Sequence, residues 1–262
     1  MFLSEMTWHE INQLDRSTVI VAPFGSIGQH GHHLPLQTDT LIGQELARRL
    51  DKECSSSLLV LPVQWLGLST HHMNFAGTIS ATVDTFLAVV CEILDSLAQA
   101  GFEKFLVLNS HCGNSSALEV ALIKCRLKHP RLRMLLVTYW NPAAQELRQL
   151  RESAVGGMGH ACEFETSLML AAKPESVRTA LIWSDGCWPV SPFQGKDMLA
   201  SGTVTVPRSF SEFSTSGCVG DPRSAFAEKG ERFFDVIIRR LVDLVREFQS
   251  GTIDSFQPVS KG

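Results

Sequence analysis

Four short apolar runs alternate with longer segments of helical period along this chain. The apolar runs are Val19 to Phe24, Leu58 to Val63, Phe105 to Leu108 and Met134 to Thr138. Helical periodicity covers Thr40 to Lys52, Val83 to Ala100, Ser115 to Lys128, Glu163 to Ala172 and Pro222 to Gln249. Because parallel strands are joined by crossover helices that cover both faces of a sheet, this alternation predicts an α/β fold with a mainly parallel central sheet.

The composition indicates a globular chain that handles small molecules. Hydrophobic residues make up 44% of the 262 residues and charged residues 19%, which suits a single domain over 1–262 with a frayed tail at about 250–262. The net charge of -4 and the lack of a basic run longer than Arg48-Arg49 argue against a nucleic-acid partner. No stretch approaches the roughly 18 apolar residues of a membrane span, and no secretory signal is present, so we expect no membrane partner and a cytoplasmic location.

Histidines follow three of the predicted strands, at the points where the strands end. His30, His32 and His33 come after the first strand, His71 and His72 after the second, and His111 after the third. Asp39 closes the glycine-rich loop that carries the first three. Since the carboxyl ends of parallel strands meet at one edge of a sheet, these side chains are expected to converge there. Imidazole and carboxylate groups are ligands of zinc, manganese and iron, so the pattern predicts a divalent-metal site.

Two glutamates enter the helical segment that starts at Glu163. Acidic residues in a first turn favour the helix dipole, so one interpretation of Glu163 and Glu165 is a solvated helix end. The apolar run Leu168 to Leu170 favours a buried helix instead, and residues two apart point to different sides. We therefore expect one of the two carboxylates to face the interior, where it would require a cation.

Other features leave alternatives open. Cys112 and Cys162 each lie close to a histidine in the sequence, which raises a nucleophilic-thiol mechanism as an alternative to a metal. The seven cysteines are scattered and form no C-x-x-C pair, so we expect reduced thiols. Residues Trp183 to Gly220 lack periodicity, and we expect an irregular segment that covers the site or contacts a neighbouring subunit.

Six ordered motifs resemble those of the creatininase (creatinine amidohydrolase) family. They are Gly25 to Asp39 (family pattern G-S-x-E-Q-H-G-x-H-L-P-L-x-T-D), Phe75 to Thr78, Asn109 to Asn114, His160 to Ser167, Gly217 to Pro222 and Ala227 to Gly230. The resemblance implies a three-layer α/β/α sandwich, usually assembled as a hexamer. It also implies a centre of one or two divalent ions, zinc or manganese with iron as an alternative, that hydrolyses C–N amide bonds.

The resemblance assigns roles residue by residue. His30, Asp39 and His111 match metal ligands of the family, with Asp39 in the bridging position, and Glu165 is the choice for the remaining ligand. His160 matches the histidine that contacts substrate and transfers a proton, so His160 and Glu165 are the predicted catalytic residues.

The chain also departs from the family pattern. The first-motif glutamate, a metal ligand, is replaced by Gly28, and creatininase itself has a further glutamate ligand where this chain has Gly113. A Trp-Asp pair before the third motif is replaced by Gly156-Gly157. These changes put one metal position in question and favour a substrate other than creatinine. His32, His33 and His72 are left with either a ligand role or a hydrogen-bonding role.

Two functions are compatible with these residues. The first is a metal-dependent amidohydrolase acting on a small amide, lactam or formamide. The second is a catalytically silent relative with a binding or assembly role, because a missing carboxylate ligand is a simple route to inactivity. The family also includes formamide hydrolases, a peptidase and lactone hydrolases, and the sequence does not choose among them.

Overall fold

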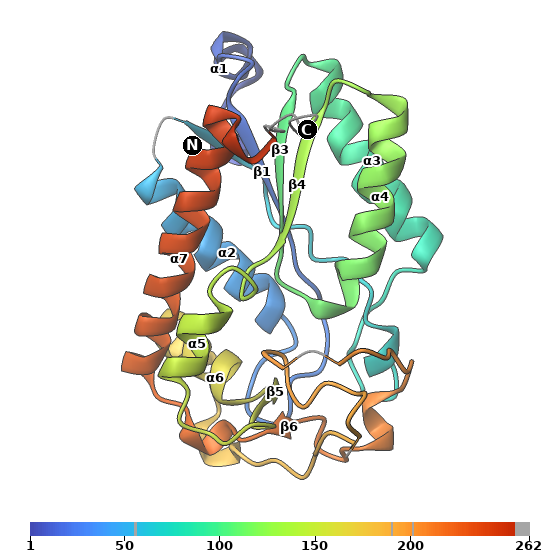
Figure 1. Ribbon diagram of the computed structural model, residues 1–262, viewed down its shortest axis with the longest axis vertical. Coiled ribbons are helices and arrows are strands. Elements are labelled where there is room, and N and C mark those ends of the chain that lie inside the picture. The colour runs from blue at the N-terminus through green and yellow to red at the C-terminus, as the bar shows by residue number, and fades with distance from the viewer. Residues whose placement is uncertain (55–56, 190, 201, 255–262) are drawn as a thin grey trace, which may run out of the picture.

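The computed structural model describes residues 1–54, 57–189, 191–200 and 202–254, and its centre is a four-stranded parallel sheet. The strands are β1 Val19–Phe24, β2 Leu58–Val60, β3 Lys104–Asn109 and β4 Arg133–Thr138, in the order β2-β1-β3-β4 (Figure 1). This confirms the predicted parallel sheet. β2 is shorter than predicted: the Leu61 N–H donates to Val21 O, but the next hydrogen bond to β1 comes from Gln64 N–H, which donates to Pro23 O, so the regular pairing is interrupted between these residues.

Helices cover both faces of the sheet. α2 Thr38–Glu53 and α7 Ala227–Ser250 lie on one face, and α3 Val83–Gln99 and α4 Ser115–Lys128 lie on the other (Figure 1). Val19 and Val21 belong to the first core, whereas Ile20, Ala22 and Phe24 belong to the second. The predicted three-layer α/β/α sandwich is therefore confirmed, and burial on both faces explains why the strands are continuously apolar.

A smaller part of the structure lies beyond the carboxyl ends of the strands. It contains α5 Ala144–Leu150, α6 Glu163–Ala172 and a two-stranded antiparallel sheet of β5 Met158–His160 and β6 Val219–Gly220 (Figure 1). The remaining helices are α1 Trp8–Gln13 and 3-10 turns at Leu3–Glu5, Thr70–His72, Cys112–Asn114, Pro174–Ser176, Thr179–Leu181, Phe210–Glu212, Pro222–Ser224 and Thr252–Asp254.

The last helix begins later than the sequence predicts. Pro222–Ser224 forms a separate 3-10 turn, and α7 starts at Ala227. α7 then packs along α6, and Gly230 makes this contact possible, since a Cβ atom there would lie 1.9 Å from the Ser167 carbonyl oxygen. The approach of the two helices fixes the position of the first turn of α6.

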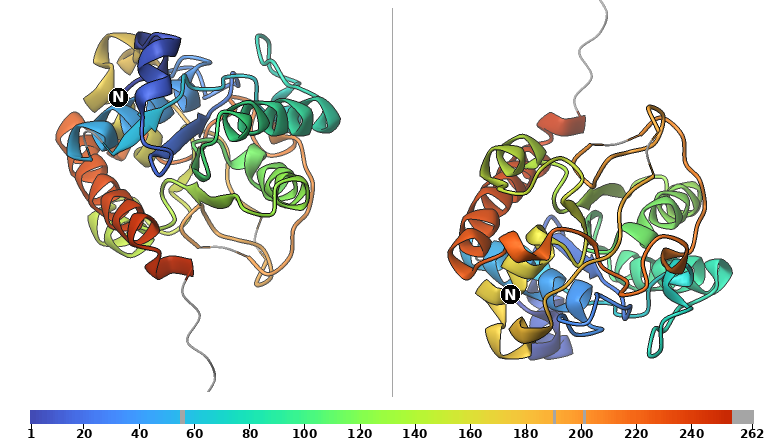
Figure 2. Two further views of the ribbon diagram at one scale, coloured as in Figure 1. Left: turned by 90° about the horizontal axis from the view of Figure 1, so that it is seen from above. Right: turned by 90° about the horizontal axis from the view of Figure 1, so that it is seen from below.

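The irregular segment predicted from Trp183 to Gly220 is confirmed in its described residues. It spreads over the end of the molecule that holds β5 and β6 (Figure 2). Of the predicted frayed tail, Ser250 ends α7 and Thr252–Asp254 is a 3-10 turn, whereas residues 255–262 lie outside the described part of the chain.

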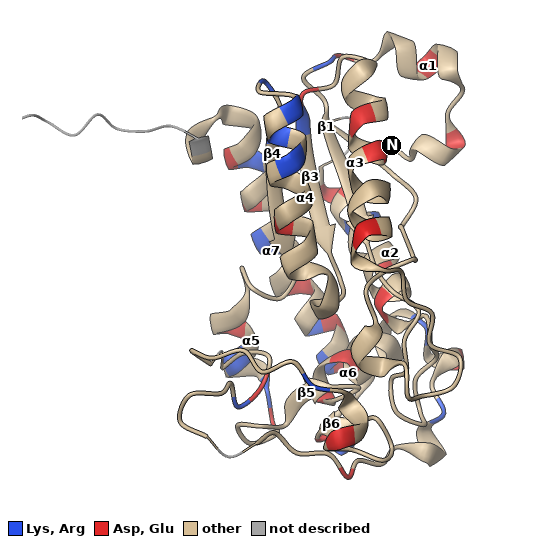
Figure 3. Ribbon diagram, turned by 90° about the vertical axis from the view of Figure 1, so that its right-hand side faces the viewer, with Lys and Arg blue, Asp and Glu red and all other residues tan. Residues whose placement is uncertain are grey.

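Charged residues are concentrated on the helices and connections, and the strands are nearly free of them (Figure 3). Among the described residues, no helix has both the length and the apolar character needed to cross a membrane. All seven cysteines are free thiols, as predicted.

Candidate metal centre

The five predicted site residues converge beyond the carboxyl end of the sheet. They are His30 from the loop after β1, Asp39 from the first turn of α2, His111 after β3, His160 at the end of β5 and Glu165 from the first turn of α6. All five are buried, with at most 8% of any residue exposed. Positions far apart in sequence are thus gathered around one point, where burial strengthens every electrostatic interaction.

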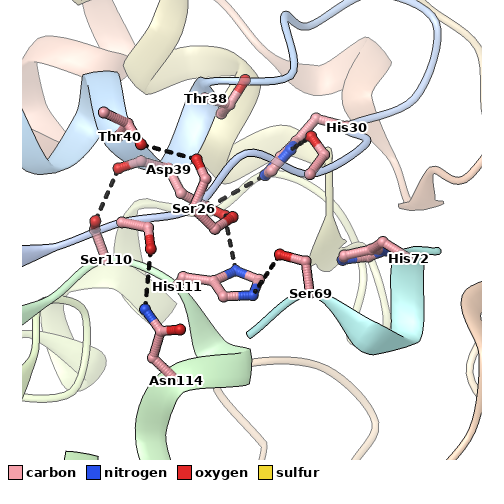
Figure 4. Close-up of polar contacts among 12 residues, drawn as sticks. Ser26, His30, Thr38, Asp39, Thr40, Ser69, His72, Ser110, His111 and Asn114 are labelled. Atoms are coloured by element: carbon pink, nitrogen blue, oxygen red, sulfur yellow. Dashed lines mark hydrogen bonds and ion pairs between the residues drawn. The ribbon is translucent and has the colours of Figure 1, made fainter. Parts of the chain in front are cut away.

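Asp39 lies between two of the histidines. Its Oδ1 is 3.3 Å from His30 Nε2, and its Oδ2 is 2.7 Å from His111 Nδ1 (Figure 4). The Ser26 hydroxyl also donates to Oδ2, at 2.7 Å. Burial opposes ionisation of Asp39, but the neighbouring His30 and His111 outweigh it and hold the pKa of this carboxyl well below its usual value.

Three histidines each have one ring nitrogen paired with a main-chain carbonyl oxygen. His30 Nδ1 lies 3.0 Å from Gly28 O, His111 Nε2 lies 3.0 Å from Leu68 O, and His160 Nε2 lies 2.7 Å from Gln29 O. Since a carbonyl oxygen only accepts hydrogen bonds, each of these nitrogens carries a hydrogen. The opposite nitrogens are therefore turned toward Asp39 or Glu165, an arrangement typical of histidines that ligate a metal.

The surroundings of His30 Nε2 show whether a metal ion fits this site. This atom is buried and makes no hydrogen bond with a described residue, yet Asp39 Oδ1 lies 3.3 Å away and Glu165 Oε1 3.9 Å away. Burial opposes protonation, but Asp39 and Glu165 raise the pKa of His30 to about 9. A positive charge is thus strongly favoured between these groups, and either a proton or a divalent cation can supply it.

Glu165 completes this side of the centre. Its Oε2 accepts the Ala161 N–H and lies 4.0 Å from His160 Nδ1. Burial, partly offset by His30, raises the pKa of Glu165 to about 7. His30, His160 and Glu165 each offer one atom within 4.8 Å of the others, and with Asp39 they form the nitrogen and oxygen donor set that zinc and manganese prefer. Sequence reasoning missed that His160 joins this group.

The prediction that only one of the two α6 glutamates faces the interior is wrong. Glu163 is also buried, and its carboxylate accepts a hydrogen bond from the Lys229 ammonium at 2.6 Å. Glu152 N and Ser153 N donate to the same carboxylate at 2.8 and 2.9 Å. Both glutamates are inward because the first turn of α6 is enclosed by α7 and the α5–β5 connection.

The other histidines have different surroundings. His33 Nε2 pairs with Thr166 Oγ1 at 2.9 Å, whereas His32 is exposed beside Trp183. His72 is buried, and its ring stacks on His160 with the centroids 4.5 Å apart. Burial first, and then the neighbouring histidines, lower the pKa of His72 well below its usual value.

The two glycines that replace family glutamates differ in the space around them. A Cβ atom at Gly28 would lie 3.4 Å from Ser69 Oγ and 3.5 Å from His72 Cδ2, which are ordinary contacts. At Gly113 a Cβ atom would lie 2.3 Å from Leu68 O, so no side chain fits without a main-chain shift. His111 therefore has Asp39 as its only carboxylate partner among the described residues.

Neighbouring polar groups hold the site together. Asn114 occupies the N-cap position of α4, but its side chain does not cap that helix. Its amide instead donates to Gly25 O and accepts from Leu68 N, which ties the loops after β1 and β2 to the start of α4. Ser110 similarly donates to the carbonyl of Asp39 (Figure 4).

Phe210 covers the histidines. Its ring centroid lies 4.8 Å from that of His160 and 4.4 Å from that of His72. The turn that carries it is anchored by Asn74, whose amide donates to Ser209 and Ser211. The irregular segment therefore covers the site, one of the two roles that the sequence left open, and the site is shielded from water.

The thiols are poorly suited to nucleophilic attack. Burial, followed by the charge of Glu165, raises the pKa of Cys162 well above its usual value. Desolvation and the charges of Asp39 and Glu165 also raise the pKa of Cys112. Since the thiolate is the reactive form, these surroundings favour the metal interpretation.

Comparison with known proteins places this geometry in a family. The family model described as creatinine amidohydrolase matches residues 4–245. The creatinine amidohydrolase of Pseudomonas putida is 26% identical over 265 residues, which span 94% of this chain and 96% of that protein. The mycofactocin precursor peptide peptidase of Mycobacterium tuberculosis is 31% identical over 85% of this chain and 82% of that protein. The chain belongs to the creatininase family.

Solved structures agree with this assignment. A crystal structure of creatinine amidohydrolase superposes with a TM-score of 0.80 and 25% identity, covering 94% of this chain and 97% of that one. Other creatininase structures are a Zn–Zn form and a manganese form. Creatininase structures thus include zinc and manganese forms, and the prediction of a divalent-metal centre is confirmed at the level of these structures and of the donor group in this chain.

Proposed function

We propose that this protein is a metal-dependent amidohydrolase that cleaves the C–N bond of a small amide or formamide, cyclic or open. The observation that supports it is His30 Nε2, a buried nitrogen that faces two carboxylates and has no hydrogen bond to a described residue. A single divalent ion, zinc or manganese, would be held by His30, Asp39 and Glu165, with His111 as a further ligand.

The bound ion would lower the pKa of a water molecule from about 15.7 toward about 7 and polarise the substrate carbonyl. Asp39, with its low pKa, supplies negative charge to the site. His160 holds its Nε2 hydrogen on Gln29 O, which leaves Nδ1 as the atom that takes up a proton and passes it to the departing nitrogen. Phe210 limits the entry of bulk water and favours small substrates.

The catalytically silent alternative has its own support in Gly28 and Gly113, neither of which can ligate a metal. Metal analysis of the purified protein tests both hypotheses. The proposal expects about one equivalent of zinc or manganese per chain, lost in His30→Ala and retained in His32→Ala, an exposed histidine two residues away. Turnover of at least one substrate in a panel of cyclic amides, formamides and short peptides is also expected. Trace metal only, after growth with zinc or manganese, would favour the silent relative.

The resemblance to the family also supports a homo-oligomer, and we propose a hexamer located in the cytoplasm. Light scattering coupled to size-exclusion chromatography measures the assembly directly. A molar mass close to that of a single 28.9 kDa chain would contradict it.

A further inference from the structure

The space beside Gly28 is occupied by a histidine that the proposed function does not use. His72 is 1% exposed, and its Cδ2 would lie 3.5 Å from a Cβ atom built on Gly28. Nε2 is bonded to Cδ2, so this nitrogen lies at the edge of the ring that borders the open position. Figure 4 shows His72 beside Ser69, on the same side of the site as His30 and across from Asp39.

The side-chain amide of Gln29 fixes which nitrogen of His72 carries the hydrogen. Gln29 Oε1 accepts the Gly31 N–H at 2.9 Å, and Gln29 Nε2 donates to Gly217 O at 3.1 Å, so the orientation of the amide is set by two main-chain groups. The same Nε2 lies 2.9 Å from His72 Nδ1. An amide nitrogen only donates, so His72 Nδ1 accepts and the hydrogen of the neutral ring is on Nε2.

Glycine at position 217 is required for this arrangement. Its φ of 81° lies in the left-handed region, and a Cβ atom there would lie 1.9 Å from Gln29 Oε1. The covering segment thus contributes a carbonyl that orients Gln29, and Gln29 in turn orients His72. The main-chain oxygen of Gln29 meanwhile receives the His160 N–H.

The surroundings of His72 offer its ring no counter-ion among the described residues and leave its Nε2–H available. The ring lies between His160, at a centroid distance of 4.5 Å, and Phe210, at 4.4 Å, and no carboxylate pairs with it among the described residues. Its only hydrogen bond with the described part of the chain is the one from Gln29 to Nδ1. A neutral imidazole with a fixed donor hydrogen can stabilise negative charge on an oxygen.

We propose that His72 is a further catalytic residue, whose Nε2–H donates a hydrogen bond to the carbonyl oxygen of the substrate. This inference rests on the proposed amidohydrolase function. The oxygen of water bonds to the carbonyl carbon as the water gives a proton to His160 Nδ1, and the π electron pair of the C=O bond moves onto the carbonyl oxygen, which accepts the hydrogen bond from His72. This electron pair then re-forms the C=O bond while the C–N bond breaks, and its electron pair leaves on the nitrogen, which takes the proton back from His160. His72 keeps its hydrogen throughout. His72 thereby provides a hydrogen-bond donor on the side of the site where Gly28 stands in place of the glutamate ligand of the family pattern.

Two substitutions at His72 test the role of the donor. His72→Phe keeps a flat ring between His160 and Phe210 but removes the hydrogen, and kcat should fall roughly 100- to 1000-fold, the cost of losing one such donor. KM should change little. His72→Gln, which restores an N–H donor, should recover part of the loss. His9→Phe, at an exposed position in α1, is the matched control and should behave as wild type.

Gln29→Glu tests the tautomer without touching the ring. A carboxylate beside Nδ1 accepts a hydrogen bond, so the hydrogen of His72 should move to Nδ1, and kcat should fall by a factor similar to that of His72→Phe. Long-range ¹H–¹⁵N spectra of protein labelled at histidine nitrogen distinguish the two tautomers. They should show the Nε2–H form in wild type and the Nδ1–H form in the variant.

The outcomes separate this inference from the function on which it rests. A wild-type protein without metal or turnover would contradict the proposed function, and the spectra would still test the tautomer. An active, metal-loaded wild type with unchanged kcat in His72→Phe would overturn the role of His72. Loss of metal in that variant would also overturn it, because His72 would then be a ligand. An Nδ1–H tautomer in the active wild type would do the same.

Discussion

Glu163 and Glu165 lie two residues apart in the first turn of α6, but different groups surround and compensate their two carboxylates. Glu163 has an internal cation, Lys229, and main-chain N–H donors from the α5–β5 connection. Glu165 receives one main-chain N–H and otherwise faces the imidazoles of His30 and His160. Burial raises the pKa of Glu165 to about 7, whereas hydrogen bonds from Lys229 and Ser153 outweigh burial and lower that of Glu163.

The difference shows how to separate a structural carboxylate from a functional one. Both residues are buried, so burial alone does not distinguish them. Glu163 is neutralised within the chain and fixes α6 against α7, whereas Glu165 lies where an external cation is needed. Substitutions that remove one charge at a time should therefore give opposite patterns of lost metal and lost stability.

The largest effect is expected from Glu165→Gln. The substitution keeps the size of the side chain but removes the carboxylate that we propose as a metal ligand, together with its contribution to holding an activated water. We expect the metal content to fall well below one equivalent and kcat/KM to fall roughly a thousandfold, or about 4 kcal/mol of transition-state stabilisation. Elemental analysis and steady-state kinetics measure the two quantities. An active variant with full metal content would remove Glu165 from the centre.

Glu163→Gln should act on stability instead. The amide leaves the buried Lys229 with only the exposed carboxylate of Glu152, 3.3 Å away, as a counter-charge, so we expect the free energy of unfolding to decrease by about 3 kcal/mol in urea titrations. Metal content per folded chain should stay at the wild-type value. Lys229→Met should cost a similar amount, and the double variant should cost less than the sum of the two. Strict additivity would mean that the two residues do not interact.

The sequence predicts the layers of this fold. It does not predict that α7 and the α5–β5 connection enclose the first turn of α6. Strand and helix patterns place β1, β3 and α4 to within a residue, because each is a regular element with a buried apolar face. The pairing of Glu163 with Lys229 joins residues 66 positions apart, and no local pattern predicts it. The motif Ala227 to Gly230 is its only signal in the sequence, and the function of its lysine becomes clear only when α7 lies against α6.

The convergence of the candidate site residues was predictable from the sequence, but the contacts between them were not. The rule that parallel strands end at one edge brings His30 and His111 together around Asp39. The tautomers of the histidines depend on carbonyl oxygens of Gly28 and Leu68, which every residue type possesses and which sequence therefore does not reveal. The position of Phe210 over the histidines could not be predicted either, because an irregular segment has no periodicity from which its path can be inferred.

A smaller effect, on the free energy of unfolding, is expected when the pH is lowered. Because the pKa of Glu163 is lowered in the folded protein, its contribution to stability is present above the unfolded pKa of about 4.3 and is lost as the pH falls through the lower folded value. The wild-type free energy of unfolding should therefore decrease below about pH 4.5, and Glu163→Gln should show a shallower decrease. Urea titrations between about pH 5 and 3 measure both slopes. Equal slopes would mean that Glu163 is not the group responsible.

The smallest effect is expected from Cys112→Ser, which tests whether Glu165 serves a metal or a thiol. In a thiol mechanism Cys112, next to His111, would be the nucleophile, and serine in its place would abolish turnover. The metal interpretation gives Cys112 no chemical step, and Asp39 and Glu165 raise its pKa rather than promote the thiolate. We therefore expect wild-type metal content, a stability change within about 0.5 kcal/mol and kcat/KM within about twofold of wild type. Loss of turnover with the metal still bound would assign the chemistry to the thiol and leave Glu165 with a supporting role.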